Sequence, residues 1–261
     1  MSVNSKMTAI ADAIRAKTGG TDALTLDGMA EAVAGIETGG GDDFAKSIVE
    51  RTITEVNDGT IETIGAYSFK NCSSLTSVNM TAAKTMYVYA FDECKYLTTV
   101  SMPSLTTGGA YGFNNCIRLE TVNMASLSGV ADNMFSSCKI KSIDLPSAKT
   151  VGQYGFKICE KLETVVIPSA TTINKYAFSN CKSLKSVVLD GNSVCTLSAS
   201  TAFYGCVHIL GTVDSTYNPD GLMDGYIYVP DALVEDYKAA TNWSTYASQI
   251  RPLSEYVEVT A

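Results

Sequence analysis

The sequence predicts an α/β solenoid of about seven stacked rungs, with a small helical module before it and a strand–helix cap after it. Two observations predict the rungs. One cysteine column recurs with spacings of 22, 22, 22, 21, 22 and 25 residues, and a phenylalanine stands three residues before each of these cysteines. A third observation predicts separate ends, because this motif does not occur before residue 69 or after residue 206. A fixed period of this length is typical of leucine-rich-repeat solenoids, whose stacked units bury what no single unit can bury alone.

The first 46 residues predict an anchor and a joint. Residues 7–36 carry apolar side chains at helical spacing, interrupted by Gly19-Gly20, and fit two short amphipathic helices. Residues 1–38 are too few to hold a core of their own, so we expect this module to pack against other subunits, a copy of the same chain included. Residues 39–46 begin with three glycines and two aspartates, and we expect a flexible hinge.

Residues 47–213 are expected to form the solenoid. Ser47 to Glu62 predicts an irregular first rung that lacks the cysteine motif but keeps Ile48, Ile53, Val56 and Ile61. In the later rungs a leucine follows the cysteine by three residues, except in the fourth, which has lost one residue and uses Ile140. Alternating apolar residues then predict a short strand. The pairs are Val78 with Met80, Val100 with Met102, Val122 with Met124, Ile143 with Leu145, Val165 with Ile167, and Val187 with Leu189.

A second apolar position begins the return leg of each coil, five residues before the phenylalanine. Prolines stop the preceding strand at matching places, since a residue without an amide proton cannot extend a hydrogen-bond ladder. The prolines are Pro103, Pro146 and Pro168, and the return-leg residues are Ile64, Met86, Val130, Val151 and Ile173.

The cysteine column is expected to be reduced and buried. Its regular place in the repeat explains these residues better than disulfide pairing, and free cysteine is among the most buried residue types. Cys195 lies outside the column and has no predicted role. The column comprises Cys72, Cys94, Cys116, Cys138, Cys159, Cys181 and Cys206.

Residues 214–261 are expected to cap the open end of the stack. Tyr226 to Val229 alternates as a strand and is stopped by Pro230. Asp231 is predicted to cap a helix from about Ala232 to Ala240. That helix would bury Leu233, Val234 and Tyr237, and the single tryptophan, Trp243, would pack it onto the last rung.

Two columns are candidate binding residues. Tyrosines two residues before the phenylalanine either project outward as an aromatic stripe for sugar rings or a protein partner, or pack at the edge of the sheet. They are Tyr67, Tyr89, Tyr111, Tyr154 and Tyr176, with Asn133 and Thr201 breaking the series. Hydroxyl residues before the inward strand residue should face outward, as a binding face or as tolerated surface residues. They are Ser77, Thr99, Thr121, Ser142, Thr164 and Ser186, of which Thr99, Thr121 and Thr164 are the favoured candidates.

Beside the hydroxyl column runs a second outward column that turns from polar to apolar towards the C-terminus. Its apolar end predicts a contact with the cap or with another subunit. The column is Asn79, Ser101, Asn123, Asp144, Val166 and Val188.

The sequence predicts neither catalysis nor a bound cofactor or metal. His208 is the single histidine and is expected at the surface of the cap or packed there. No two cysteines are closer than the 11 residues from Cys195 to Cys206, which argues against zinc. Asp214, Asp220 and Asp224 lie in one polar loop whose spacing does not fit a calcium-binding EF-hand.

Charge and hydropathy exclude further classes. A net charge of -8 without a run of basic residues argues against nucleic acid as a partner. We expect no membrane insertion, because no window approaches the roughly 18 apolar residues of a spanning helix. Met1 to Lys17 also lacks the apolar centre of a signal peptide.

The repeat as a whole, read from Ile64-Gly-Ala-Tyr-Ser-Phe-Lys-Asn-Cys-Ser-Ser-Leu-Thr-Ser-Val, resembles the BspA-like leucine-rich-repeat family over residues 48 to about 210. Members of that family are bacterial and microbial-eukaryote surface or secreted proteins implicated in adhesion, without catalytic repeat positions. The resemblance therefore implies binding rather than turnover.

Both ends carry a further resemblance. Ile10-Ala-Asp-Ala-Ile-Arg-Ala-Lys-Thr-Gly-Gly with Leu24-Thr-Leu-Asp-Gly-Met is similar to the start of tail or fibre-like proteins from phages and prophages of gut Firmicutes. The stretch from Tyr226 to Trp243 is similar to the cap of repeat proteins from the same sources. These likenesses imply a virion protein, assembled in the bacterial cytoplasm, that displays the solenoid to a host-surface glycan or protein. The alternatives are a structural decoration or fibre protein of the virion and a bacterial BspA-like surface adhesin.

Overall fold

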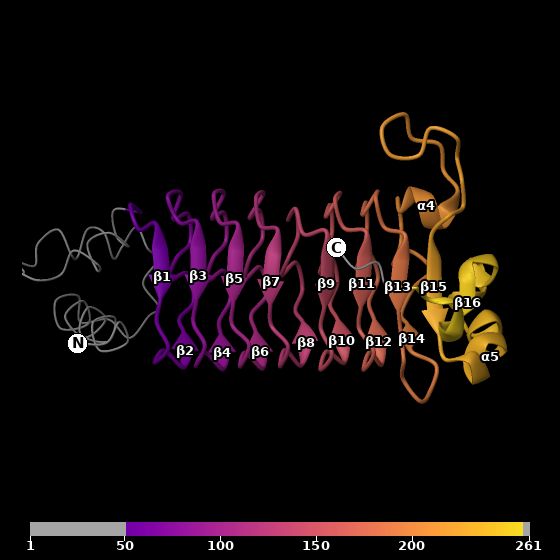
Figure 1. Ribbon diagram of the computed structural model, residues 1–261, viewed down its shortest axis with the longest axis horizontal. Helices are drawn as coiled ribbons and strands as arrows, with labels where there is room; N and C mark the ends of the chain where they lie inside the picture. Colours follow the sequence, from indigo (N-terminus) through magenta and orange to yellow (C-terminus); the bar gives the residue numbers. More distant parts are fainter. Residues whose placement is uncertain (1–50, 258–261) are drawn as a thin grey trace, which may run out of the picture.

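The computed structural model describes residues 51–257 and shows the predicted leucine-rich-repeat solenoid (Figure 1). The predicted helical module, the hinge and the start of the first rung, residues 47–50, lie outside the described residues. Each rung gives a three-residue strand to a front sheet and a two-residue strand to a lower sheet, and paired strands run parallel. The front strands are β1 (Glu55–Asn57), β3 (Ser77–Asn79), β5 (Thr99–Ser101), β7 (Thr121–Asn123), β9 (Ser142–Asp144), β11 (Thr164–Val166) and β13 (Ser186–Val188). The lower strands are β2 (Thr63–Ile64), β4 (Thr85–Met86), β6 (Thr107–Gly108), β8 (Gly129–Val130), β10 (Thr150–Val151), β12 (Thr172–Ile173) and β14 (Thr196–Leu197).

A third side of the coil is formed by the tyrosine–phenylalanine–cysteine segment. In the first such segment the amides of Tyr67, Phe69 and Asn71 all donate to carbonyls of the next rung, at 3.1, 2.8 and 2.8 Å. Two of these donors, Tyr67 and Asn71, are in the left-handed region, with φ of 61° and 60°. A left-handed conformation costs a non-glycine residue roughly 1–2 kcal/mol, and the ladder of hydrogen bonds between rungs offsets that cost.

Phenylalanine and cysteine build the core as continuous columns. Neighbouring phenylalanine rings stack with centroids 4.9–5.6 Å apart from Phe69 to Phe203. The cysteines are buried as predicted, but they do more than fill space. From Cys94 onward each column thiol donates to the phenylalanine carbonyl of the preceding rung, at 2.9 Å from Cys94 Sγ to the Phe69 oxygen. The repeat therefore selects a small side chain that is also a donor.

The front and lower sheets are both interrupted between the third and fourth repeats. The front strands divide into a sheet ending at β7 and another beginning at β9, and the lower strands divide between β6 and β8. Most repeats close the turn after the cysteine with a bond such as the 3.1 Å from the Leu75 amide to the Cys72 oxygen. The fourth repeat lacks one residue there, and its Lys139 amide donates instead to the Leu119 carbonyl at 3.0 Å. The third side remains continuous, since the Phe113 amide donates to the Met134 carbonyl at 2.8 Å.

Methionine fills the core where the third repeat has glycine on its return leg. A Cβ atom at Gly108 would lie 2.5 Å from Met134 Cε, and one at Gly112 would lie 2.4 Å from Met86 Cε. Both methionines are buried. Long, flexible thioether side chains from the neighbouring rungs thus fill the space that an apolar side chain would occupy in the third repeat.

The cap continues the front sheet and then covers the last rung. Strand β15 (Tyr226–Val229) confirms the predicted strand and pairs with β13, and β16 (Ile250–Pro252) pairs with β15. Val188 is in register with Tyr228 of β15, so the apolar end of the outward column contacts the cap. The short helical segments are α4 (Val207–Leu210), η1 (Asp231–Leu233), α5 (Val234–Ala239), η2 (Trp243–Gln249) and η3 (Leu253–Glu255).

The predicted cap helix is shorter than expected and is capped differently. A 3₁₀ turn comes first, and α5 starts only at Val234. Asp231 is not its N-cap, because the Asp231 carboxylate accepts a hydrogen bond from the Ser254 amide at 3.0 Å. Of the three predicted core residues, Tyr237 is buried, whereas Leu233 and Val234 are partly buried against the core.

Cys195, which had no predicted role, is held by the cap at the open edge of β14. Its amide donates to the Tyr237 hydroxyl at 2.9 Å, and its carbonyl accepts from Trp243 Nε1 at 2.6 Å. The Trp243 and Tyr246 rings lie 6.3 and 5.2 Å from the Phe203 ring and end the phenylalanine column. Trp243 therefore packs on the last rung, as predicted, and its ring nitrogen also satisfies the edge of the sheet.

Candidate binding surfaces

The front sheet presents the predicted hydroxyl column to solvent. Thr99 and Thr121 are exposed and Thr164 is half-buried, while the next residue of each strand points into the core. Successive members are in parallel register, Thr99 with Thr121 and Thr164 with Ser142. Between Thr121 and Ser142 the register is lost, because β7 and β9 are not hydrogen-bonded neighbours.

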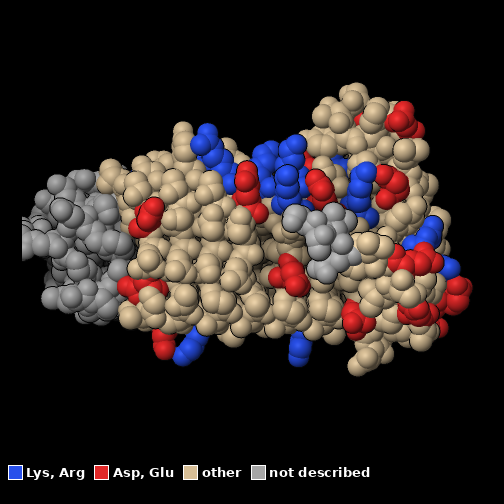
Figure 2. All heavy atoms as spheres, viewed as in Figure 1, with Lys and Arg blue, Asp and Glu red and all other residues tan. Residues whose placement is uncertain are grey.

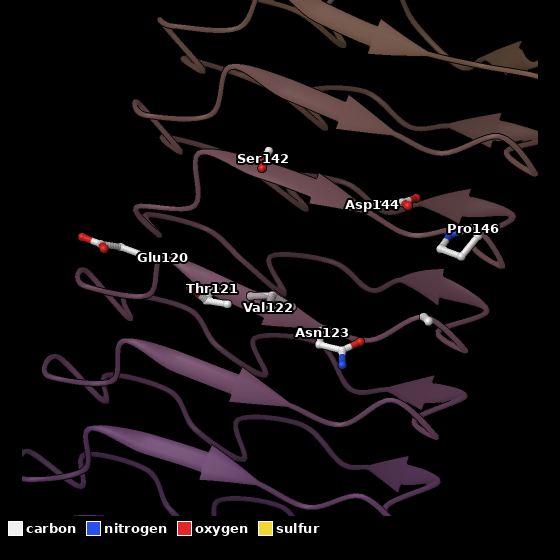
Figure 3. A pocket seen from close by; sticks show the side chains of 8 residues that line it. Glu120, Thr121, Val122, Asn123, Ser142, Asp144 and Pro146 are labelled. Carbon is white, nitrogen blue, oxygen red and sulfur yellow. The ribbon is translucent and has the colours of Figure 1, made fainter. Parts of the chain in front are cut away.

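A shallow groove of about 460 Å³ lies at this interruption. Figure 3 shows its lining side chains on β7 and the residue before it, on β9, and on the turn that follows β9. The sequence analysis did not predict this groove. The signal that could have indicated it is the 21-residue spacing of the cysteines in the fourth repeat. The lining residues are Glu120, Thr121, Val122, Asn123, Ala125, Ser142, Asp144 and Pro146.

Val122 shows that the groove reaches towards the core. The equivalent inward residues Val100 and Ile143 of the flanking repeats are buried, whereas Val122 is only partly buried. The groove therefore combines a patch of aliphatic carbon from Val122 and Pro146 with hydroxyl, amide and carboxyl groups around it. Such a mixture suits a ligand with both a C–H surface and hydroxyl groups.

Basic side chains gather beside the groove. Figure 2 shows Lys and Arg along the upper edge of the front face, above β9 and β11. Residues 117–190 hold nine Lys and Arg against six Asp and Glu, in a chain whose total charge is -8. Lys139, Lys141 and Lys161, here called the lysine rim, come from the turns that lead into β9 and β11. Within residues 51–257 none of the three forms an ion pair, whereas Lys182 and Lys185 pair with Asp214 and Asp224 at 3.1 and 2.7 Å.

The tyrosine column lies on the third side of the coil, away from the threonines of the front sheet. Its members are half-buried and stack on one another, with centroids 4.7 Å apart for Tyr89 and Tyr111 and 5.4 Å apart for Tyr154 and Tyr176. Asn133 divides the column into two parts. Lys70 Nζ lies 5.2 Å from the centroid of the Tyr89 ring and Lys157 Nζ lies 5.0 Å from that of Tyr154. The tyrosines are thus packed against one another and partly exposed, and their role in binding stays a prediction.

His208 is packed rather than exposed. Its Nδ1 lies 2.6 Å from Asp224 Oδ1, and Asp224 Oδ2 accepts from Lys185 Nζ at 2.7 Å. Desolvation raises the pKa of Asp224, but hydrogen bonds from Lys185 and His208 outweigh it and leave the pKa below its usual value. This ion-paired group fixes α4 and the following loop to the sixth repeat.

The polar loop between α4 and β15 has structural partners for two of its aspartates. The Asp214 carboxylate accepts from the amides of Thr216 and Tyr217 at 3.0 and 3.1 Å, and these bonds help to keep its pKa low. Over residues 51–257, no three His, Cys, Asp or Glu side chains converge as a metal-binding group. In the same part of the chain, no helix has the length and apolarity needed to cross a membrane.

A family comparison matches this geometry. The BspA type leucine rich repeat region is found in six copies, over residues 44–156 and 149–215. The chain belongs to this family. BspA-type and other leucine-rich repeats are generally non-enzymatic binding scaffolds, and the described residues supply the interior and the open surfaces of such a scaffold.

Solved structures agree on the fold. A leucine-rich repeat protein from Eubacterium ventriosum is 26% identical with a TM-score of 0.51, and the match covers 59% of this chain and 43% of that one. A leucine-rich repeat protein of T. pallidum is 24% identical with a TM-score of 0.50, covering 59% and 70%. The chain thus spans less than half the length of the Eubacterium protein. A comparison with curated protein sequences finds no match.

Proposed function

We propose that this BspA-type protein is a tail or fibre-like component of a phage or prophage virion, that residues 1–38 attach it to other virion subunits, and that its solenoid binds a host-surface glycan or protein. The observation that carries the binding role is the front sheet. Short strands in register hold outward side chains on a continuously packed core, so a ligand finds a rigid surface with little ordering cost.

The virion assignment is supported by the sequence at the two ends, where residues 10–29 and 226–243 are similar to phage and prophage proteins of gut Firmicutes. The test is mass spectrometry of particles purified after prophage induction. Peptides of this chain should co-purify with tail proteins. Their absence from particles, with the chain found on uninduced cells, would favour the bacterial adhesin instead.

Host binding has its own test. The labelled full chain should bind host cells and should compete with the particles for attachment. A chain that is present in particles but binds no host cell would be a decoration or fibre spacer, the structural alternative.

A further inference from the structure

We infer that the groove between β7 and β9, together with the lysine rim, binds an anionic saccharide. The inference rests on the proposed function and names the ligand class of its solenoid. It starts from the interruption of the front sheet at the fourth repeat, which lacks one residue, since the groove lies where β7 and β9 are not hydrogen-bonded neighbours.

The groove has the chemistry of a sugar site. A pyranose ring presents C–H groups on its faces and hydroxyl groups around its edge. Val122 and Pro146 supply aliphatic contact, while Asn123 and Ser142 offer amide and hydroxyl groups that can bond to the hydroxyls of a sugar (Figure 3). A volume of about 460 Å³ is that of a small-ligand site rather than of a protein interface.

The lysine rim decides the charge of the ligand. Lys141 directly precedes Ser142, which lines the groove, and Lys139 lies in the shortened turn itself. Lys161 follows at the turn of the next rung, and adjacent rungs are separated by about 4.8 Å. Three ammonium groups without an ion pair among residues 51–257 attract an anion at this edge. The Glu120 carboxylate in the groove favours hydroxyl groups over a second anionic group there.

The sugar ring therefore occupies the groove and its acidic group faces the lysine rim. A carboxylate, as in a uronic-acid polymer, and a phosphate, as in a polyol-phosphate polymer, share this chemistry. Both kinds of polymer serve as probes, with neutral dextran as the uncharged comparison.

Matched variants of the full chain test each half of the site. Replacing Lys139, Lys141 and Lys161 together by Gln should weaken binding of an anionic polymer roughly tenfold or more, because each exposed charge contact contributes a small share. The same change at Lys84, Lys175 and Lys238, which lie elsewhere, should leave it unchanged. N123A should weaken binding roughly three- to tenfold, whereas N79A, at the equivalent place on β3, should not.

The arms of the experiment separate the outcomes. If the chain binds one of the two anionic polymers more strongly than the other, that polymer identifies the acidic group as a carboxylate or a phosphate. Equal losses in the two lysine triples, or equal effects of N123A and N79A, would reduce the interaction to general charge attraction and overturn the site. If neither polymer binds while the chain still binds host cells, this inference fails and the proposed function stands. If the chain binds no host cell, the proposed function itself fails.

Discussion

The repeats and the cap are stabilised by different kinds of contact. In the repeats the phenylalanine of one rung rests on that of the next, so Phe113 has Phe91 on one side and Phe135 on the other, at 5.2 and 5.6 Å. In the cap each contact is made once, as between Tyr237 and the Cys195 amide. Repetition satisfies both faces of every inner rung, whereas the last rung needs residues that occur nowhere else in the pattern.

The largest effect should follow from interrupting a column in its middle. Phe113→Ala removes a fully buried ring with neighbours on both sides and should lower the free energy of unfolding by about 3–5 kcal/mol. Urea unfolding followed by circular dichroism measures it. Tyr96→Ala, at an exposed aromatic residue, should change it by about 0.5 kcal/mol or less. Similar losses in both variants would contradict the role given to the column.

A smaller effect should follow from a single bond of the cap. Tyr237→Phe keeps the ring but leaves the buried Cys195 amide without its acceptor, and should cost about 1–3 kcal/mol. Because Trp243 lies 5.3 Å from the Tyr237 ring, its fluorescence should report the loss first. Tyr204→Phe, at an exposed tyrosine, is the control. An unchanged unfolding midpoint for Tyr237→Phe would show that the bond is dispensable.

The cysteine column should respond more modestly still. Cys116→Ala deletes the thiol that donates to the Phe91 carbonyl at 3.1 Å and should cost about 1–2 kcal/mol. Cys116→Ser keeps a donor and should recover part of that loss.

The same column should be chemically inert in the folded protein. Burial raises the pKa of Cys159 to about 12, and alkylation near pH 8 should be far slower than in urea. Rapid labelling of the folded chain would show that the core opens.

The smallest effect should appear with acid, and in the cap and its loop alone. The pKa values of Asp214 and Asp231 are lowered mainly by hydrogen bonds from Thr216 and Ser254. A carboxyl group whose pKa is lower in the folded protein stabilises the fold fully at pH values above its ordinary pKa of 3.8. That stabilisation is lost as the pH falls from 3.8 through the lowered pKa. Hydrogen exchange, corrected for intrinsic rates, should therefore show less protection of the Thr216 and Ser254 amides at pH 3 than at pH 6.

The core provides the control for this acid effect. The Phe113 amide donates to a backbone carbonyl and should keep its protection at both pH values. Asp214→Asn should reproduce the acid effect at Thr216 when measured at pH 6. Equal loss of protection at Phe113 would mean that acid unfolds the whole solenoid.

Sequence patterns predicted the interior of the repeats well and the contacts of the cap poorly. A residue that recurs every 22 positions has a recurring environment, which is why Phe and Cys could be placed in the core and Thr99 and Thr121 outside. Asp231 could not be placed, because an aspartate before a short helix is equally suited to cap it or to bond to a chain segment 23 residues later. Cys195 had no pattern from which to infer a partner.

The candidate site, too, was predicted in part from the sequence and decided in part by the structure. The sequence showed that the fourth repeat is one residue short and that Thr121 faces outward. The groove depends on the interruption of the front sheet between β7 and β9, whereas the lower strands β8 and β10 still pair across the missing residue and the third side stays intact.

The sequence by itself thus determined the rung, its columns and its inward and outward faces, because period and alternation fix which side of a coil a residue occupies. The period also implies that counterparts in successive rungs lie next to one another. Only the tertiary structure decided which other groups meet across rungs. Four features depend on contacts between residues about 20 to 50 positions apart in the sequence. They are the left-handed tyrosines, the thiol bonds between rungs, the edge-on end of the phenylalanine column and the groove at β7 and β9. The pattern within one repeat does not specify these contacts.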